Sequence, residues 1–72
     1  MLIQTKAGQA AAVAAALRDV PGVSEAAIVA GPYDVIARAQ AQNVDDLGKL
    51  VVSKVHALIG VERTLTCPVV HL

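Results

Sequence analysis

The chain has 72 residues, a net formal charge of zero and one cysteine, which indicates a single small domain without an internal disulfide. It shows no signal-peptide pattern and no apolar run long enough to cross a bilayer, and its zero charge argues against a surface that binds nucleic-acid phosphates. We therefore expect a reduced, cytoplasmic protein that contacts neither membrane nor nucleic acid directly.

The first elements in the chain are a predicted strand and a predicted helix. Residues 1–5 (MLIQT) alternate between apolar and polar side chains, as a half-buried strand does. Residues 7–20 are rich in alanine, which favours a helix, and they place Val13, Leu17 and Val20 on one helical face. The Pro-Gly pair that follows is a stop signal for this helix.

Two further strands, joined by a turn, are predicted next. Residues 23–30 (VSEAAIVA) and 34–41 (DVIARAQA) have strand patterns, and the sequence GPYD lies where they meet. A four-residue connection with Pro32 at its second position is typical of a hairpin turn.

The last third of the chain predicts a second helix and a final strand. Asn43 is a good N-cap and Gly60 a good C-terminal stop, so a helix is expected over 43–60. Residues 61–67 (VERTLTC) then predict a strand. The apolar side chains of this helix share one face: Leu47, Leu50, Val51, Val55 and Leu58.

This order of elements, β-α-β-β-α-β with short connections, predicts an α+β protein of ferredoxin-like fold. Right-handed crossovers would put both helices on one face of a four-stranded antiparallel sheet. The first and third strands would be central and the second and fourth would form the edges. We treat residues 1–72 as one domain.

Alternation along the strands predicts which side chains face the helices. On the third strand these are Val35, Ala37 and Ala39. On the last strand the more apolar set is expected to face the helices, namely Val61, Arg63, Leu65 and Cys67. The opposite face would then carry Ile36, Arg38, Gln40, Thr64 and Thr66, and it suits either a second subunit or an ordinary solvent surface.

The candidate catalytic residues form no recognisable constellation. His56 and His71 have no cysteine, serine or carboxylate at a telling spacing, so a solvated or capping role is expected for each. Cys67 is expected to be a small buried hydrophobe. The sequence has no metal-ligand spacing and no phosphate-binding or cofactor fingerprint. We therefore expect neither catalytic residues, nor a metal site, nor a cofactor, and we do not expect an enzyme.

Composition favours self-association. Hydrophobic residues make up 56% of the chain, which is more than a small domain can hide in its own core. Small scaffolds that lack disulfides and metals often gain stability by oligomerising. An alanine-rich composition without functional meaning is the alternative.

Several segments, in order and spacing, resemble one known family. The Pro-Gly-Val after the first helix, the Gly-x-Tyr-Asp turn, the Asp-Leu helix start at 46–47 and the Gly-Val-x-x-Thr-x-Thr strand at 60–66 are similar to the effector-binding (RAM) domain of the Lrp/AsnC transcription regulators. This resemblance covers essentially the whole chain. It implies the same βαββαβ fold, pairing of sheets face to face into homodimers (a dimeric α+β barrel), and assemblies of dimers up to octamers.

The resemblance also implies a function and a site. Family members bind amino acids or related metabolites in clefts where dimers meet. The matching residues here are Gly31, Tyr33, Asp34, Thr64 and Thr66. Asp34 could face an α-ammonium group and the threonine hydroxyls could add polar contacts. The alternatives are that Asp34 bonds the backbone of its own turn and that Tyr33 is only an assembly contact.

One departure from the family pattern affects the functional hypothesis. Regulators of this family usually carry an N-terminal helix-turn-helix domain, whereas this chain begins at the first strand of the effector module. A stand-alone module that senses a metabolite and co-assembles with a full-length Lrp/AsnC regulator is one interpretation, and a fragment of such a regulator is another. A small dimeric α/β-barrel enzyme, an ACT-like module and a purely structural assembly module remain as alternatives.

Overall fold

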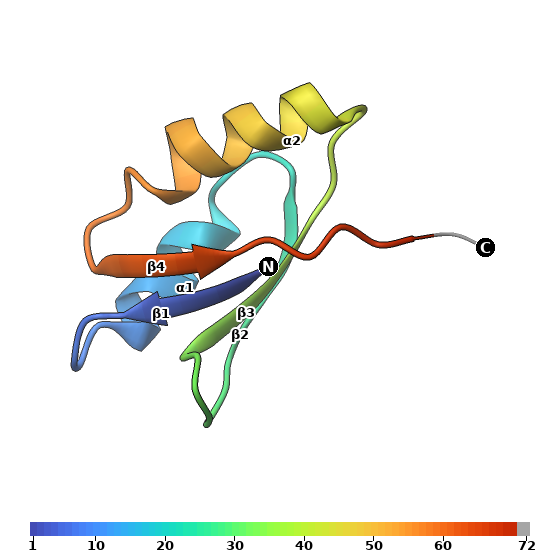
Figure 1. The fold of residues 1–72 in the computed structure, drawn as a ribbon. Helices are drawn as coiled ribbons and strands as arrows, with labels where there is room; N and C mark the ends of the chain where they lie inside the picture. The colour runs from blue at the N-terminus through green and yellow to red at the C-terminus, as the bar shows by residue number, and fades with distance from the viewer. Residues whose placement is uncertain (71–72) are drawn as a thin grey trace.

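The computed structural model of the chain describes residues 1–70 and has the element order predicted above (Figure 1). The elements are β1 (Leu2–Thr5), α1 (Ala10–Arg18), β2 (Val23–Ile28), β3 (Val35–Ala39), α2 (Val44–Leu50), a π-helical continuation η1 (Val51–Val55), and β4 (Val61–Leu65). Both helical segments are shorter than the predicted ranges 7–20 and 43–60, since the residues at the ends of these ranges belong to loops. His71 lies outside the described residues.

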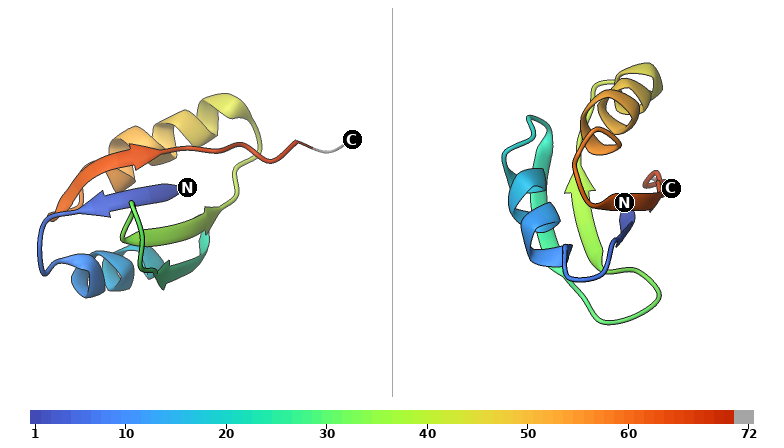
Figure 2. Two further views of the ribbon diagram at one scale, coloured as in Figure 1. Left: turned by 60° about the horizontal axis from the view of Figure 1, so that its bottom comes forward. Right: turned by 90° about the vertical axis from the view of Figure 1, so that its left-hand side faces the viewer.

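The four strands form one antiparallel sheet in the order β2-β3-β1-β4, so the predicted topology is confirmed. The central pair β1 and β3 aligns Ile3 with Val35. Both helical segments lie on the same side of the sheet (Figure 2), and their buried residues join those of the strands in one core. The fold is therefore ferredoxin-like α+β, as the spacing of the elements predicted.

The core consists mainly of small aliphatic side chains. Val13 and Leu17 of α1 and Val55 of η1 are fully buried against Ile3 and Val35. This confirms the predicted apolar faces of both helices. Because no aromatic ring contributes to the core, stability depends on close packing of many small contacts.

The predicted N-cap of the second helix is confirmed, whereas the helical segment ends at Val55, before the stop predicted at Gly60. The side chain of Asn43 accepts a hydrogen bond from the backbone N–H of Asp46 (2.8 Å), which caps the start of α2. Beyond η1, Gly60 adopts a φ of +98°, and a Cβ added there would lie 3.0 Å from Cγ2 of Val13. Glycine is therefore required at this turn both by backbone conformation and by packing.

The predicted facing of the last strand is correct at Val61 and wrong at Arg63, Thr64 and Leu65. Thr64 pairs with the buried Ile3 and so lies on the helix side, whereas Leu65 pairs with Leu2 on the open side. The cause is a register shift in β4 opposite the Gln4–Thr5 step, which inserts one extra residue between Val61 and Arg63. Val61 and Thr64 thus share the helix face although they are three residues apart.

Candidate functional site

The turn that carries the only tyrosine is longer than predicted. It spans residues 29–34 and is closed by a hydrogen bond from the backbone N–H of Val29 to the carbonyl of Asp34 (2.9 Å). Gly31 is exposed with open space around it, and Tyr33 is half-buried. The turn therefore forms a protruding corner of the sheet, visible at the end of β2 and β3 in Figure 1.

The carboxylate of Asp34 ties this turn to the end of β1. Its Oδ2 accepts hydrogen bonds from the backbone N–H of Thr5 (2.8 Å) and from the Thr5 hydroxyl (3.3 Å). The backbone N–H of Asp34 donates to the carbonyl of Ile3 (2.9 Å). Thr5 is a buried polar residue, 8% exposed, so its N–H depends on this acceptor. Asp34 therefore has a structural role at β1, a partner that sequence reasoning did not anticipate.

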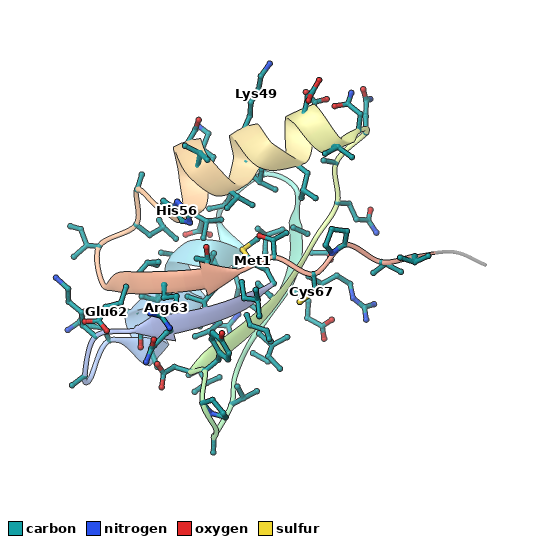
Figure 3. The ribbon with its side chains drawn as sticks, viewed as in Figure 1. Met1, Lys49, His56, Glu62, Arg63 and Cys67 are labelled. Atoms are coloured by element: carbon teal, nitrogen blue, oxygen red, sulfur yellow. The ribbon has the colours of Figure 1, made fainter. Side chains whose placement is uncertain are left out.

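The hydroxyl of Thr64 is also engaged, on the opposite side of β1. A hydrogen bond of 2.6 Å joins Thr64 Oγ1 and His56 Nε2, and either atom can donate, depending on the imidazole tautomer. Figure 3 shows His56 between the second helical segment and β4. The sequence suggested only a solvated or capping histidine, and no local signal marks this pair because it depends on how the helix is packed over the strand.

The five predicted site residues fall into two groups within one subunit. Gly31, Tyr33 and Asp34 lie together at the turn beside β1. Thr64 is separated from them by β1, because the strand order is β3-β1-β4. Thr66 lies further along the chain, past the end of β4. A single copy of the chain therefore does not gather all five residues into one pocket.

A large open hollow lies at the Thr66 end of the sheet. It has a volume of about 740 Å³ and lies between the end of β3, the start of α2 and the segment after β4. Arg38 and Thr66 supply polar groups, and Met1 and Leu47 supply apolar surface. A smaller hollow of about 220 Å³ borders the outer edge of β4, where His56 and Thr64 meet.

The open face of the sheet carries an apolar row that crosses all four strands. Ala27 pairs with Ile36, Ile36 with Leu2, and Leu2 with Leu65, so the four side chains are direct cross-strand neighbours. Ile36 and Leu65 are 44% and 46% exposed. We call these four residues the sheet row. A contiguous apolar row on an exposed sheet face is a candidate interaction surface.

Cys67 was predicted to be buried and is exposed, because it lies two residues past the end of β4. Within residues 1–70, no group of three or more His, Cys, Asp or Glu side chains is arranged to hold a metal ion. None of the helices described is long and apolar enough to span a membrane.

Known proteins with similar sequences are transcription regulators by name. The chain is 39% identical over 54 residues to an uncharacterized HTH-type transcriptional regulator of Pyrococcus furiosus, and 35% identical to one of Pyrococcus abyssi. Each match covers 75% of this chain and 36% of the relative. The matched part of this chain thus spans little more than a third of the length of these curated relatives.

Solved structures share the fold. A hypothetical protein from Pyrococcus horikoshii superimposes with a TM-score of 0.80 at 29% identity, covering 86% of this chain and 75% of that one. A protein from Thermus thermophilus gives a TM-score of 0.80 at 34% identity, covering 86% and 78%.

The fold and the family comparison define a domain of a ligand-binding class. A family model described as the Lrp/AsnC ligand binding domain matches residues 1–71, and the chain belongs to this family. The resemblance stated from the sequence motifs is therefore confirmed.

Proposed function

We propose that the chain is a small-molecule sensing and oligomerisation module that acts indirectly in transcriptional regulation. Two copies pair through their open sheet faces into a dimeric α+β barrel, and an amino acid or related metabolite binds where dimers meet. The module works by binding and assembly, without catalysis. We treat residues 1–72 as a single such domain.

The observation that carries the proposal is the sheet row of Leu2, Ala27, Ile36 and Leu65. In a solvated sheet face these positions would be mostly polar. A second copy packed on the row would remove apolar surface from water, with a stabilisation of roughly 25 cal/mol per Å² buried. Flanking polar pairs, Glu25 opposite Arg38 and Arg63 opposite Gln4, would form a rim around this contact.

The separation of the predicted site residues also favours a site between subunits. Gly31, Tyr33 and Asp34 lie at one end of the sheet, and Thr66 lies toward the other. Assembly of several copies offers a way for the turn of one copy to meet the threonines of another. An amino acid suits such a cleft, because its ammonium group would pair with Asp34 and its carboxylate with hydroxyl and main-chain donors.

Asp34 could serve a ligand without giving up its structural role. Within residues 1–70 its hydrogen bonds from Thr5 both use Oδ2, which leaves Oδ1 for an ammonium group. Tyr33 would supply a rigid wall with a polar tip. On this proposal the turn takes part both in ligand binding and in the contact between dimers. The ligand then shifts the assembly equilibrium because it binds one assembly state more tightly than the other.

The partner that we propose is a full-length Lrp/AsnC regulator in addition to other copies of this chain. The named relatives are HTH-type transcriptional regulators, and the matched segment is a minority of their length. Co-assembly through the shared module would change how a regulator's DNA-binding domains are arranged, without any contact between this domain and DNA.

A thermal-shift screen of the twenty amino acids, followed by native mass spectrometry with each hit, tests the proposal. We expect at least one amino acid to raise the unfolding midpoint and to alter the distribution of assembly states. A ligand at a hundredfold excess over its Kd adds about 2.7 kcal/mol to stability. Tyr33→Phe keeps the ring and removes the hydroxyl, so it should fold normally and weaken the response. If no amino acid shifts either quantity, the sensing part of the proposal is wrong.

A further inference from the structure

A second exposed apolar surface lies on the helix layer, and its first residue, Val44, also borders the hollow of about 740 Å³. Val44 and Val52 are 83% and 65% exposed, and Gly48 lies between them at a spacing of four residues on either side. A Cβ added at Gly48 would have no heavy atom within 4 Å, so this part of the helix faces open space. We call Val44, Gly48 and Val52 the helix stripe.

The composition of the helix stripe is unfavourable for an isolated solvent-facing helix. Glycine in a helix interior is about 1 kcal/mol less favourable than alanine, and valine is also a weaker helix former than the straight-chain residues. Neither valine gains from burial in a single copy, because both are mostly exposed. The stripe is therefore more consistent with a contact surface than with a helix optimised for solvent.

We propose that the helix stripe is a contact between two copies of this chain, in which the continuous helical segment formed by α2 and η1 packs antiparallel against the same segment of the second copy. The two-fold axis passes near Gly48, and Val44 of each copy then lies against Val52 of the other. This contact is isologous, because each copy uses the same surface. The lack of a side chain at Gly48 lets the two helices approach closely at the crossing point.

Charge complementarity selects a second copy as the occupant. Asp45 and Lys49 lie one helical turn apart on the same exposed flank of the stripe. In an antiparallel pair, equivalent flanks face each other across the axis. Along the helix axis, Asp45 of one copy and Lys49 of the other are then separated by the rise of about two residues, which is roughly 3 Å. The symmetry makes two such pairs of opposite charge.

The orientation of α2 agrees with this contact. Figure 3 shows the Lys49 side chain directed away from the sheet, on the outer side of the helix. The contact therefore does not compete with pairing through the open sheet face, which lies on the other side of the molecule. Two isologous contacts on different faces of one chain join dimers into a closed ring or a longer array.

This inference rests on the proposed function, because the sheet row supplies the dimer that the helix stripe connects to the next one. It adds a second contact between dimers, on the helix layer and separate from the cleft proposed for the ligand. The sheet row and the helix stripe share no residue, so the two contacts can be removed one at a time.

The sharpest test reverses the charges of Asp45 and Lys49 beside the helix stripe and measures assembly by sedimentation velocity. We expect the wild-type chain to form species larger than a dimer. Lys49→Asp alone and Asp45→Lys alone each place like charges across the axis and should leave dimers, with the dissociation constant for joining dimers raised about tenfold or more. The double variant Asp45→Lys/Lys49→Asp restores opposite charges and should recover the larger species.

A size change at Gly48 gives an independent test that does not depend on charge pairing. Gly48→Arg fills the crossing point and should leave dimers, whereas Gly48→Ala adds only one methyl group there and should weaken the larger species much less. Far-UV circular dichroism of every variant checks that the helix is intact. Single charge variants that assemble like wild type, or a double variant that fails to recover, would overturn the inference.

The two proposals fail in distinguishable ways. If the wild-type chain forms only dimers, and Ile36→Glu dissociates them, the sheet pairing is supported and the helix contact is refuted. Dimers that survive Ile36→Glu but dissolve with Lys49→Asp support the helix contact and refute the sheet pairing. A chain that is monomeric at high micromolar concentration refutes both.

Discussion

The imidazole of His56 and the hydroxyl of Thr64 lie 2.6 Å apart (Nε2 to Oγ1), and this bond joins the end of η1 to the edge strand β4. Thr64 is also one of the residues that the family resemblance assigns to ligand binding. A ligand that takes the Thr64 hydroxyl would have to share it with His56 or displace the imidazole. The pair is therefore a direct physical link between the proposed ligand site and the helix that carries the helix stripe.

Removal of this link should have a small and specific energetic effect. His56→Ala should lower the free energy of unfolding by about 0.5–1 kcal/mol, at the low end of the range for a hydrogen bond because the pair is exposed. Urea denaturation of His56→Ala, Thr64→Val and the double variant gives a double-mutant cycle. A coupling energy near zero would mean that the contact contributes nothing in solution.

Asp34 should be required for stability even in the absence of any ligand. Asp34→Ala leaves the buried N–H of Thr5 without its acceptor, and we expect a loss of about 1–3 kcal/mol. Asp19→Ala is the matched control, because it removes an exposed aspartate at the end of α1 and should change stability by no more than about 0.5 kcal/mol. Stability should be compared at a protein concentration where both variants have the same assembly state. Equal losses in the two variants would contradict the anchoring role of Asp34.

Two glycine-to-alanine substitutions should have effects of opposite sign. Gly60→Ala puts a Cβ 3.0 Å from Val13 Cγ2 at a φ of +98°, so it should destabilise by about 1–3 kcal/mol. Gly48→Ala lies in a helix with open space around it and should stabilise by up to about 1 kcal/mol. Thermal unfolding of both variants measures the difference. A neutral result for Gly60→Ala would show that this turn relaxes easily.

The burial of the small aliphatic core can be tested at one valine. Val13 is fully buried, and Val13→Ala should cost about 2 kcal/mol from lost burial and packing. Val70→Ala, at a position 76% exposed in the segment after β4, should change stability by less than about 0.5 kcal/mol. Chemical denaturation at matched protein concentration gives both values. Similar costs at the two positions would mean that Val70 is buried by another copy.

The proposed sheet pairing predicts the effect of one charge on the open face. Ile36→Glu places a carboxylate in the middle of the sheet row, where a packed second copy would have to desolvate it. We expect the sheet-paired dimer to dissociate, as measured by sedimentation. Ile59→Glu is the control, because Ile59 is 91% exposed in the loop before β4 and outside the row. Dimers that persist equally in both variants would argue against pairing through the sheet.

The sequence by itself determined the order of elements, the topology and most of the core. Helical periodicity identified Val13, Leu17, Val51 and Val55 as buried, and alternation identified Val35 and Ala37, because these patterns depend only on repeats within one element. Asn43 as N-cap was also readable, since a cap depends on a few neighbouring residues. The helix nevertheless ends at Val55 and not at the stop predicted at Gly60, which forms the turn before β4.

Only the tertiary structure decided which way the side chains of β4 face and what the polar residues contact. The register shift opposite the Gln4–Thr5 step reversed the faces of Thr64 and Leu65, because a bulge arises from how two strands pair and leaves no mark in the alternation of one strand. The bonds from Asp34 to Thr5 and from His56 to Thr64 likewise join segments that are brought together only by the fold. Local patterns specify each element, whereas the partners of its polar groups depend on the packing between elements.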